Sequence, residues 1–318
     1  MLRPEEIAVF QKEGYLHGGP CLTDEEVDEL RGELDRVIAD KDDPHVPQPA
    51  LLRNMLELGD AQRARFQEVV GDGNVPDTAE FASLRKRFGD DEQLRAWLRA
   101  RLAEAAEGRQ VWQIVNIWMA SRPFRRLLEH PKITADIAQL TGSKELRVWH
   151  DQIQYKPAEQ GGVTSWHQDA PAWPVIAPMT EVSAWVALDD VDESNGCMSM
   201  VPGSHRWGDA SELLHQLASF DAVPVSFHGH DVRVVRRPVR KGEVHYHHAL
   251  TWHGSHANTS GRPRRAIAIH YMLDGTRFVA SGQHPIKRLI EVPDGAPVEG
   301  RWFPVCYRRE AVPANENE

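Results

Sequence analysis

Hydrophobic positions in the first part of the chain recur at helical spacing. Four apolar residues of the segment 23–40, "TDEEVDELRGELDRVIAD", lie three or four residues apart, namely Val27, Leu30, Leu34 and Val37. Thr23 and Glu26 have the spacing of a capping box at the start of that helix. Segments 77–88 and 91–107 are two further predicted helices.

Several shorter segments complete this helical part. The strongly apolar "VWQIVNIWMA" (111–120) is predicted to be a buried helix, and "FRRLLEH" and "PKITADIAQLTG" to be helical, with Gly142 as the stop signal. Residues 43–60 contain three prolines and one glycine and are predicted to be a loop.

After Gly142 the pattern changes to short apolar runs separated by Gly, Pro, Asn and Asp. Six of these runs are predicted strands: "LRVWHDQIQYKP", "EVSAWVALDDV", "CMSMVP", "DVRVVRRPV", "GEVHYHHAL" and "RRAIAIHYML". Many short strands favour a sandwich, barrel or jelly roll. We therefore expect a mainly β protein, with a helical region over 1–142 packed on a β domain over 143–310, and a disordered tail over 311–318.

Charge and composition narrow the partners. The net charge of -10, a pI of about 5.9 and the lack of a basic patch argue against a nucleic-acid partner. No apolar run approaches the roughly 20 residues needed to cross a bilayer, and the first residues lack a signal peptide's apolar core. Cys21, Cys197 and Cys306 are too scattered for a disulfide framework or a thiolate zinc site. These features predict a soluble cytoplasmic protein; nothing in them predicts an oligomeric state.

Histidines cluster in the β part, where most of the sixteen lie between His150 and His284. His167 and Asp169 stand two apart, so on a strand both side chains would face one ion. With a second histidine they would form the 2-His-1-carboxylate set that holds iron(II). Candidates for it lie in "HYHHALTWHGSHANTSGRPRRAIAIHYM", where His245 and His247 form a rival metal pair.

Three motifs in this order carry a family resemblance: "WHQD", "NGCMSMVPGSHRWG" and "WHGSHANTSGRPRR". Over roughly residues 146–273 the chain resembles the phytanoyl-CoA dioxygenase family. The resemblance implies a double-stranded β-helix, a cupin-like jelly roll, with the N-terminal helices packed outside. It also implies an iron(II)- and 2-oxoglutarate-dependent dioxygenase that uses O2 and hydroxylates a small molecule, producing succinate and CO2. His167, Asp169 and His253 match the iron ligands and catalytic residues.

The resemblance also implies contacts for the cosubstrate. Arg264, eleven residues after His253, matches the arginine that holds the far carboxylate of 2-oxoglutarate, with Arg262 and Arg265 as neighbouring alternatives. Arg264 and Arg265 should face opposite sides of a strand, so only one can point inward. The further predicted cosubstrate contacts are Gln168, Trp185, Ser255, Gln152 and Gln154.

Other residues carry weaker expectations. Tyr155, Trp173, Trp252 and Arg277 are predicted to contact the substrate. Ser204 and His205 lie in a Gly-Ser-His turn that we interpret as structural, because no G-x-S-x-G elbow surrounds it. His256 and His270 are interpreted as residues of a polar cavity, and the role of His245, His247 and His248 stays open.

Three interpretations compete at this point. For the dioxygenase, the presence of Asp169 favours hydroxylation over halogenation, while desaturation, epoxidation and ring formation stay open. The second interpretation is a cupin-like non-oxidative metalloprotein or binding module that uses His245 and His247 as ligands and for which Arg264 is dispensable. The third is a structural or interaction jelly roll with a degenerate site, which would bind neither metal nor cosubstrate.

Overall fold

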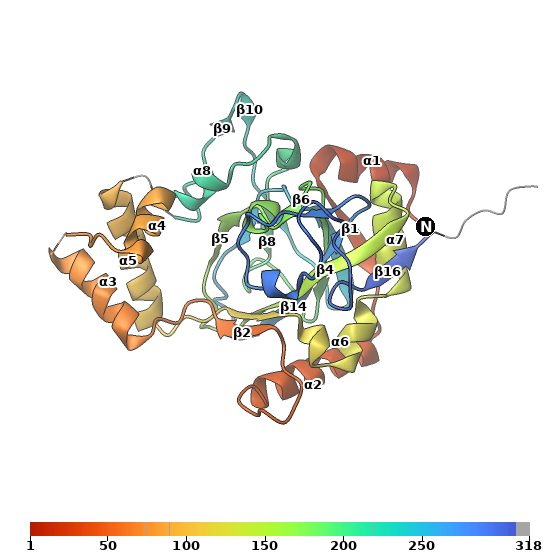
Figure 1. The fold of residues 1–318 in the computed structure, drawn as a ribbon, viewed down its shortest axis with the longest axis horizontal. Coiled ribbons are helices and arrows are strands. Elements are labelled where there is room, and N and C mark those ends of the chain that lie inside the picture. The colour runs from red at the N-terminus through yellow and green to blue at the C-terminus, as the bar shows by residue number, and fades with distance from the viewer. Residues whose placement is uncertain (73, 89, 218, 310–318) are drawn as a thin grey trace, which may run out of the picture.

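Two antiparallel sheets form the body of the protein, and helices cover the outside of the larger one (Figure 1). The computed structural model describes residues 1–72, 74–88, 90–217 and 219–309. The predicted tail over 311–318 lies outside the described residues. No described helix is both long enough and apolar enough to cross a membrane.

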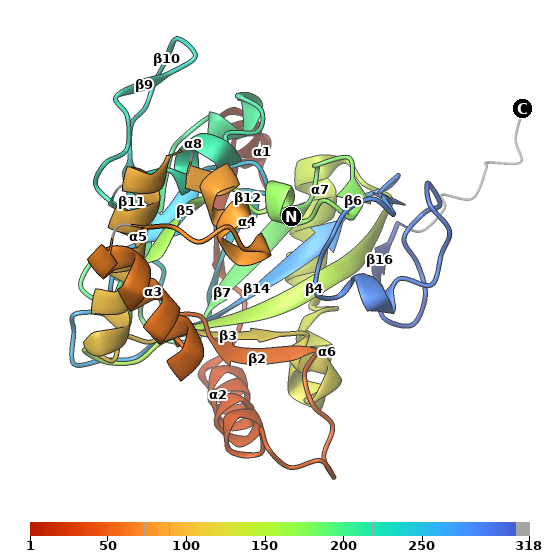
Figure 2. The same ribbon diagram turned by 60° about the vertical axis from the view of Figure 1, so that its left-hand side comes forward.

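The larger sheet has eight strands in the order β1-β12-β7-β14-β4-β3-β2, with β16 also paired to β4 (Figure 2). Their bounds are β1 Tyr15–Pro20, β2 Leu51–Asn54, β3 Trp112–Val115, β4 Glu145–Lys156, β7 Val182–Ala187, β12 Glu243–His248, β14 Arg264–Met272 and β16 Val305–Arg308. Three of these strands come from the N-terminal part of the chain. This region therefore supplies both edges of the main path as well as helices.

The smaller sheet has four strands in the order β11-β8-β13-β5. Their bounds are β5 Thr164–His167, β8 Met198–Met200, β11 Val235–Arg237 and β13 His253–Ser255. Two short hairpins complete the strands: β6 Ile176–Ala177 with β15 Arg277–Phe278, and β9 Ser226–Phe227 with β10 His230–Asp231. This arrangement confirms the predicted jelly roll.

Eight α-helices and four short 3-10 turns are described. The helices are α1 Pro4–Glu13, α2 Asp24–Ala39, α3 Asp60–Asp72, α4 Ala79–Phe88, α5 Asp91–Ala106, α6 Arg122–Leu127, α7 Pro131–Thr141 and α8 Ser211–His215. The 3-10 turns are Ile117–Met119, Ala170–Ala172, Ser204–Arg206 and Lys287–Leu289. The predicted capping box of Thr23 and Glu26 starts α2, and Gly142 ends α7 in the left-handed conformation.

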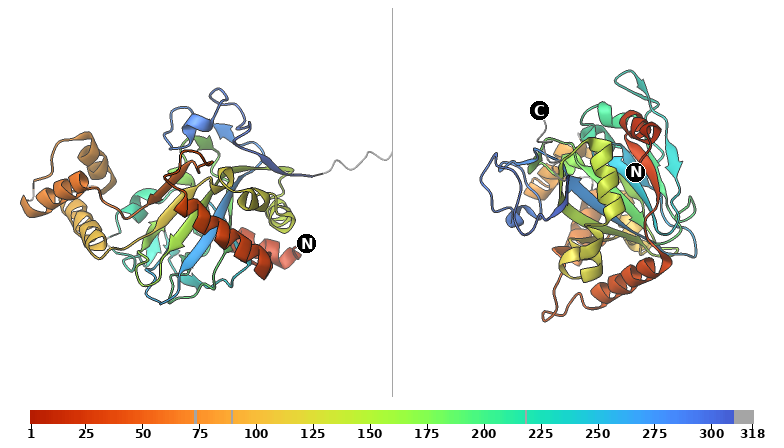
Figure 3. Two further views of the ribbon diagram at one scale, coloured as in Figure 1. Left: turned by 90° about the horizontal axis from the view of Figure 1, so that it is seen from below. Right: turned by 90° about the vertical axis from the view of Figure 1, so that its right-hand side faces the viewer.

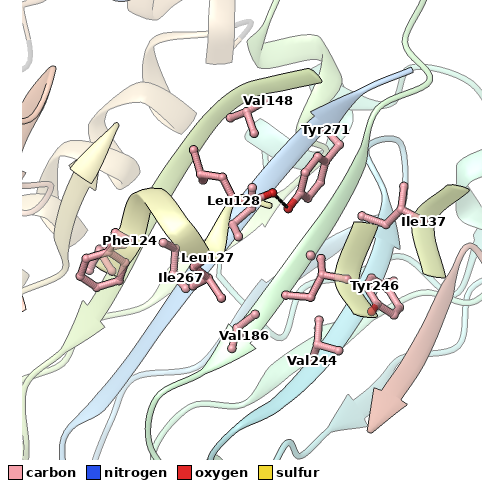
Figure 4. Close-up of a cluster of buried hydrophobic side chains, with 14 of the residues drawn as sticks. Phe124, Leu127, Leu128, Ile137, Val148, Val186, Val244, Tyr246, Ile267 and Tyr271 are labelled. Carbon is pink, nitrogen blue, oxygen red and sulfur yellow. Dashed lines mark hydrogen bonds between the residues drawn. The ribbon is translucent and has the colours of Figure 1, made fainter. Parts of the chain in front are cut away.

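The outer face of the larger sheet packs against α1, α2, α6 and α7 as one apolar core (Figure 3, left). Alternate residues of β7 and β14 enter it, as the period of two predicts: Val182, Ala184, Val186, Ile267, Ile269 and Tyr271. Two buried tyrosine hydroxyls find hydrogen-bond acceptors there. The Tyr271 hydroxyl donates to the Leu128 carbonyl at 2.8 Å (Figure 4). The Tyr246 hydroxyl donates to Asp136 at 2.9 Å.

Helices α3, α4 and α5 form a separate helical unit at one end of the molecule (Figure 1). Their apolar side chains pack with each other, not with the main core: Phe66, Val69, Phe81, Phe88, Leu94 and Leu98. Phe66 and Trp97 meet edge to face, with ring centroids 6.0 Å apart. The unit has its own core, and its helix α4 contacts α8, which lies against β5 of the smaller sheet.

Some predicted elements are wrong. The segment 111–120 is not a helix but β3 followed by a 3-10 turn, because Asn116 takes a left-handed φ of 56° that breaks any regular continuation. An apolar run of this length suits a buried strand as well as a buried helix. The predicted loop 43–60 contains β2, and α1 and α3 were not predicted.

Candidate active site

Three side chains converge between the two sheets. The ligand atoms of His167, Asp169 and His253 all lie within 4.8 Å of one another. The Nε2 atoms of both histidines are 3.6 Å from Asp169 Oδ1. His167 ends β5 and His253 begins β13, directly opposite each other in the smaller sheet. Asp169 lies beyond the end of β5 in helical backbone, φ -71°, so a turn and not strand alternation brings its carboxylate to the histidines.

Hydrogen bonds fix the tautomers of the two histidines. His167 Nδ1 is 2.8 Å from the Ser165 carbonyl, and His253 Nδ1 is 2.9 Å from the Thr251 carbonyl. A carbonyl only accepts, so each Nδ1 carries the proton and each Nε2 directs a lone pair at the centre. Backbone anchoring of this kind is common for metal-bound imidazoles. The residues therefore fit a divalent metal ion.

The second oxygen of Asp169 is held by protein groups. Ser183 Oγ donates to Oδ2 at 3.1 Å, and His247 Nε2 donates to it at 3.2 Å. Ser183 in turn accepts from His270 Nδ1 at 2.7 Å. These contacts orient the carboxylate and leave Oδ1 toward the two histidines.

The electrostatics of the carboxylate suit cation binding. Burial acts to raise the pKa of Asp169, but His253, His167 and His247 outweigh it and hold the pKa well below its usual range. Burial, together with His167, keeps the pKa of His253 well below its usual range. The group is thus ready as an anionic carboxylate beside a neutral imidazole, which is the protonation state that metal ligation requires.

A second buried polar group, the guanidinium of Arg264, lies on the larger sheet. Arg264 is 1% exposed, and its Nη2 donates to Ser255 Oγ at 3.1 Å and its Nη1 to the Gln154 carbonyl at 3.4 Å. Its Cζ lies 5.5 Å from the centre of the Trp185 ring. Its Nε has no partner, and no carboxylate among the described residues forms an ion pair with it. A buried guanidinium without an anion is the natural counterpart of a bound carboxylate.

Lys156 adds a second buried cation beside Arg264. It is 0% exposed, and its Nζ donates to Ser255 Oγ and the His256 carbonyl, both at 2.6 Å. Burial, followed by the charge of Arg264, holds the pKa of Lys156 well below its usual range. Because Ser255 Oγ accepts from both Lys156 and Arg264, its own proton is left to donate to a third group. The hydroxyl therefore fits the same carboxylate as the guanidinium.

A cavity of about 700 Å³ leads from the triad to the surface. Its inner wall includes the β4 residues His150, Gln152 and Gln154, and its outer wall the helical unit through Phe66 and Trp97. Trp173 and His270 meet edge to face on its inner side, with ring centroids 4.7 Å apart. We call this space the chamber; its volume falls in the range of small-molecule sites.

The comparisons with known proteins agree with this site. The phytanoyl-CoA dioxygenase family matches residues 10–266. The chain belongs to this family. A curated relative, peroxisomal phytanoyl-CoA dioxygenase of Rattus norvegicus, is 27% identical over 180 residues, which are 51% of each chain. The chain thus matches about half the length of that relative.

Solved structures of similar fold extend over almost the whole chain. The non-heme alpha ketoglutarate dependent carbocyclase SnoK from nogalamycin biosynthesis is 24% identical with a TM-score of 0.64, and covers 96% of each chain. The epimerase SnoN, in complex with Fe3+, alpha ketoglutarate and nogalamycin RO, is 23% identical with a TM-score of 0.62, and covers 95% of this chain and 97% of its own. At these identities the likeness establishes the jelly-roll fold.

Most of the cosubstrate residues predicted from the phytanoyl-CoA dioxygenase family lie together. Trp185, Ser255 and Gln154 line the small inner pocket beside the triad. Arg264 faces inward, whereas Arg265 faces outward and bonds Asp189 at 2.9 Å. Arg262 is exposed and pairs with Asp192.

Other predicted contacts lie elsewhere. Gln168 is turned away: its Nε2 donates to the carbonyls of Gly208 and Leu250, at 2.9 and 2.7 Å, which ties two loops together. Tyr155 packs on the outer core, Trp252 is buried in a separate apolar cluster, and Arg277 is exposed and donates to the Gly295 carbonyl. Of the four predicted substrate contacts only Trp173 lines the chamber. For Tyr155 strand alternation already implied the outer face.

The dense histidines of β12 have separate environments. His247 donates a hydrogen bond to Asp169 Oδ2, as described above. His245 stacks on Tyr15 with centroids 5.6 Å apart, and the rings of His245 and His247 are 6.4 Å apart. Among the described residues only the triad forms a group compatible with a metal ion. The geometry gives no support to the rival pair.

The Gly-Ser-His turn is structural, as predicted. Gly203 adopts a left-handed φ of 78°, and Ser204 Oγ accepts from the Trp252 amide at 2.8 Å. Nothing links Ser204 and His205 as nucleophile and base. The hydrogen bond to Ser204 Oγ holds the turn after β8 against Trp252, the residue before His253.

Sequence reasoning missed three residues of the site: Lys156, Ser183 and His247 in its role toward Asp169. A signal for Lys156 was present, since it continues the row His150, Gln152, Gln154 along one face of β4. Ser183 likewise shares a face with Trp185 on β7. Small hydroxyl residues carry no pattern that separates a functional contact from a packed one.

Proposed function

We propose that this chain is a non-haem iron(II)- and 2-oxoglutarate-dependent dioxygenase that hydroxylates a small organic molecule. The observation that carries the proposal is the pairing of two sites beside one small inner pocket. Asp169 and His253 line this pocket, and so does Ser255, which accepts from Arg264. At one end two imidazole lone pairs and one carboxylate oxygen meet, and at the other end a buried guanidinium has no acidic partner. A 2-oxoglutarate molecule has an oxoacid end for the first and a carboxylate for the second.

Each residue has a role in this proposal. His167, Asp169 and His253 would hold iron(II), and a set of three protein ligands is the one that non-haem iron oxygenases use with a cosubstrate and O2. Arg264 and Ser255 bind the far carboxylate, and Lys156 orients the serine. Trp185 and Gln154 form the wall between the two ends. Iron(II), 2-oxoglutarate and O2 together supply the oxidising power for attack on a C–H bond, and yield succinate and CO2.

The protein's own contribution is positioning and exclusion of water. Ser183 and His247 hold the carboxylate of Asp169, so the metal geometry is set before a ligand arrives. The helical unit and Trp173 enclose the chamber in which the substrate would lie. The relative SnoN was solved with Fe3+ and alpha ketoglutarate, which supports the same cofactors here. Cytoplasmic location and the type of product stay predictions.

The test begins with anaerobic protein. Addition of iron(II) and 2-oxoglutarate should produce the weak visible charge-transfer band of the chelate, and admission of O2 should yield succinate. Arg264→Gln should weaken 2-oxoglutarate binding by at least about tenfold, since it removes a charged hydrogen bond. Arg262→Gln, two residues away on the surface, is the matched control. Absence of both the band and succinate would rule out the proposal.

A further inference from the structure

The inner row of β4 changes character along its length. Lys156 lies beside Arg264, Gln154 borders the inner pocket and the chamber, and Gln152 and His150 line the chamber alone. Successive members of this row stand about 6–7 Å apart, because every second residue of a strand shares a face. Positive charge is confined to one end of the row, and the other end carries neutral polar groups.

The orientation of the two amides follows from their partners. Arg53 Nε donates to Gln113 Oε1 at 2.8 Å, and Gln113 Nε2 then donates to Gln152 Oε1 at 2.9 Å. An arginine can only donate, so this chain of bonds leaves Gln152 with its Nε2 as a donor for another group. Trp185 Nε1 donates to Gln154 Oε1 at 3.2 Å and fixes that amide in the same way.

His150 offers the opposite polarity. Its Nδ1 is 3.3 Å from the Asp151 carbonyl, which can only accept, so Nδ1 carries the proton and Nε2 is a lone-pair acceptor. The side chain is 2% exposed, and Nε2 has no hydrogen-bond partner among the described residues. Burial, then His270 and His284, hold the pKa of His150 well below its usual range, so the ring stays neutral. A buried acceptor without a donor costs about 1–3 kcal/mol, which a ligand hydroxyl would recover.

The charged residues of the chamber wall nearly balance. Besides Asp169 they are Arg53, Glu57, Arg101 and Glu104, and Arg101 already pairs with Glu104 at 3.1 Å. Arg53 donates its Nε to the neutral amide of Gln113 and forms no ion pair with a carboxylate among the described residues, so it stands as a single cation and not as part of a cluster. A polyanion such as an acyl-CoA would find no free cluster of cations on this wall. The remaining lining is largely apolar or aromatic, with Trp97, Trp166 and Trp173 as its largest members.

We propose that the chamber selects an uncharged substrate with an apolar body, which donates a hydroxyl to His150 and accepts from Gln152 through an oxygen about 6–7 Å away. The inference rests on the proposed function, since it names the substrate class of that site. His150 acts as a specificity residue and takes no part in holding the metal. The aromatic walls suit a flat ring system between them.

The test measures binding without turnover. The anaerobic full-length protein with 2-oxoglutarate is dialysed to equilibrium at pH 6.5 against 7-hydroxycoumarin, 7-methylcoumarin or coumarin-3-carboxylate. We expect 7-hydroxycoumarin to bind about tenfold more tightly than 7-methylcoumarin, which matches it in size but has no donor, and the carboxylate to bind most weakly. His150→Phe should abolish the preference, His150→Gln should keep part of it, and His130→Phe, at a half-buried histidine outside the chamber, should leave it unchanged.

Several results would overturn the inference. Equal binding of the hydroxyl and methyl compounds to the wild-type protein, or tightest binding of the anion, would do so even if the His150 variants failed to fold. A His150→Phe protein that kept the full preference would do so as well. The charge-transfer band is recorded separately on the same preparations, so loss of the oxygenase proposal and loss of the substrate inference give different patterns.

Discussion

The two faces of the larger sheet are formed by the same strands but have different roles. On β14 the outward residues Ile267, Ile269 and Tyr271 enter the apolar core under the helices. The inward residues of that strand are Arg264, Ala266, Ala268 and His270. All of them are buried, so burial does not distinguish the faces. The outer face fills its space, whereas on the inner face Ala268 and His270 line the small inner pocket.

This difference shows how the fold tolerates buried basic side chains that destabilise it. A buried arginine and lysine without acidic partners lower the stability of the folded protein. The apolar face on the same strands supplies compensating free energy, since each fully buried aliphatic side chain contributes about 1.5–3 kcal/mol. The comparison predicts that substitutions on the outer face change stability and those on the inner face change binding.

The largest effect is expected at the metal ligands. His253→Ala should weaken iron(II) binding by more than about 100-fold, because loss of a direct ligand exceeds the loss of an outer partner. The melting temperature should change little, since the ring lies in a cavity. Iron titration by calorimetry measures the loss. His256→Ala, three residues on and half-exposed, serves as the control, and unchanged iron affinity in His253→Ala would contradict the assignment.

The opposite face should respond in stability. Ile267→Ala removes a fully buried side chain from the outer core and should lower the free energy of unfolding by about 2–5 kcal/mol. Urea titration measures this change. Iron affinity of the folded variant should stay at the wild-type value, because Ile267 points away from the cavity. An equal loss of iron affinity would mean that the two faces are not separable.

A pH-dependent effect is expected where the sheet meets α2. Burial acts to raise the pKa of Asp189, but its bonds with Arg265 and the charge of Arg31 outweigh it and hold the pKa below its usual value. The stability that ionised Asp189 gains from Arg265 and Arg31 is therefore fully present above about pH 4, the pKa range of an unfolded aspartate. It is lost as the pH falls through the lower pKa of the folded state. Asp189→Asn should cost about 2 kcal/mol at pH 7 and progressively less in acid. A constant difference between pH 7 and pH 3 in urea titrations would contradict this origin.

The smallest effect is expected from the support of Asp169. Ser183→Ala removes the hydroxyl that donates to Oδ2 and should weaken iron binding by about tenfold. His247 still holds that oxygen, so the site should remain assembled. Ser183→Thr, which keeps a hydroxyl, should retain more of the affinity than Ser183→Ala. Equal iron affinity in wild type and Ser183→Ala would show that the carboxylate needs no such support.

The parts of the site that lie on regular strands could be predicted from the sequence. Alternation on β14 correctly placed Arg264 inward and Arg265 outward, and alternation on β7 placed Trp185 opposite the apolar residues. The family resemblance is confirmed by the match over residues 10–266. The convergence of His167 and Asp169 was predicted, but for a reason that proved wrong, because Asp169 lies in a turn.

Side chains in turns and apolar runs could not be predicted in the same way. Gln168 lies directly after the end of β5, where strand alternation stops, so its neighbours in the sequence say nothing of its direction. Trp252 stands beside His253 in the sequence, but it packs in an apolar cluster whose other members are far away in the sequence. The segment 111–120 has no periodicity that separates strand from helix, and only its pairing with β4 decides it. Contacts between residues far apart in the sequence determine these conformations, and the local sequence pattern does not contain them.

The pairing of β1 with β12 has a consequence for how the chain matures. Tyr15 lies opposite His247, so the strand near the start of the chain waits for a partner more than 200 residues later. At a synthesis rate of roughly 5–20 residues per second, that wait lasts on the order of ten seconds or longer on the ribosome. During it the unpaired edge of β1 is open to strands of other chains. Nascent-chain quality control, and not the finished enzyme, should therefore be most sensitive to substitutions in Tyr15–Pro20.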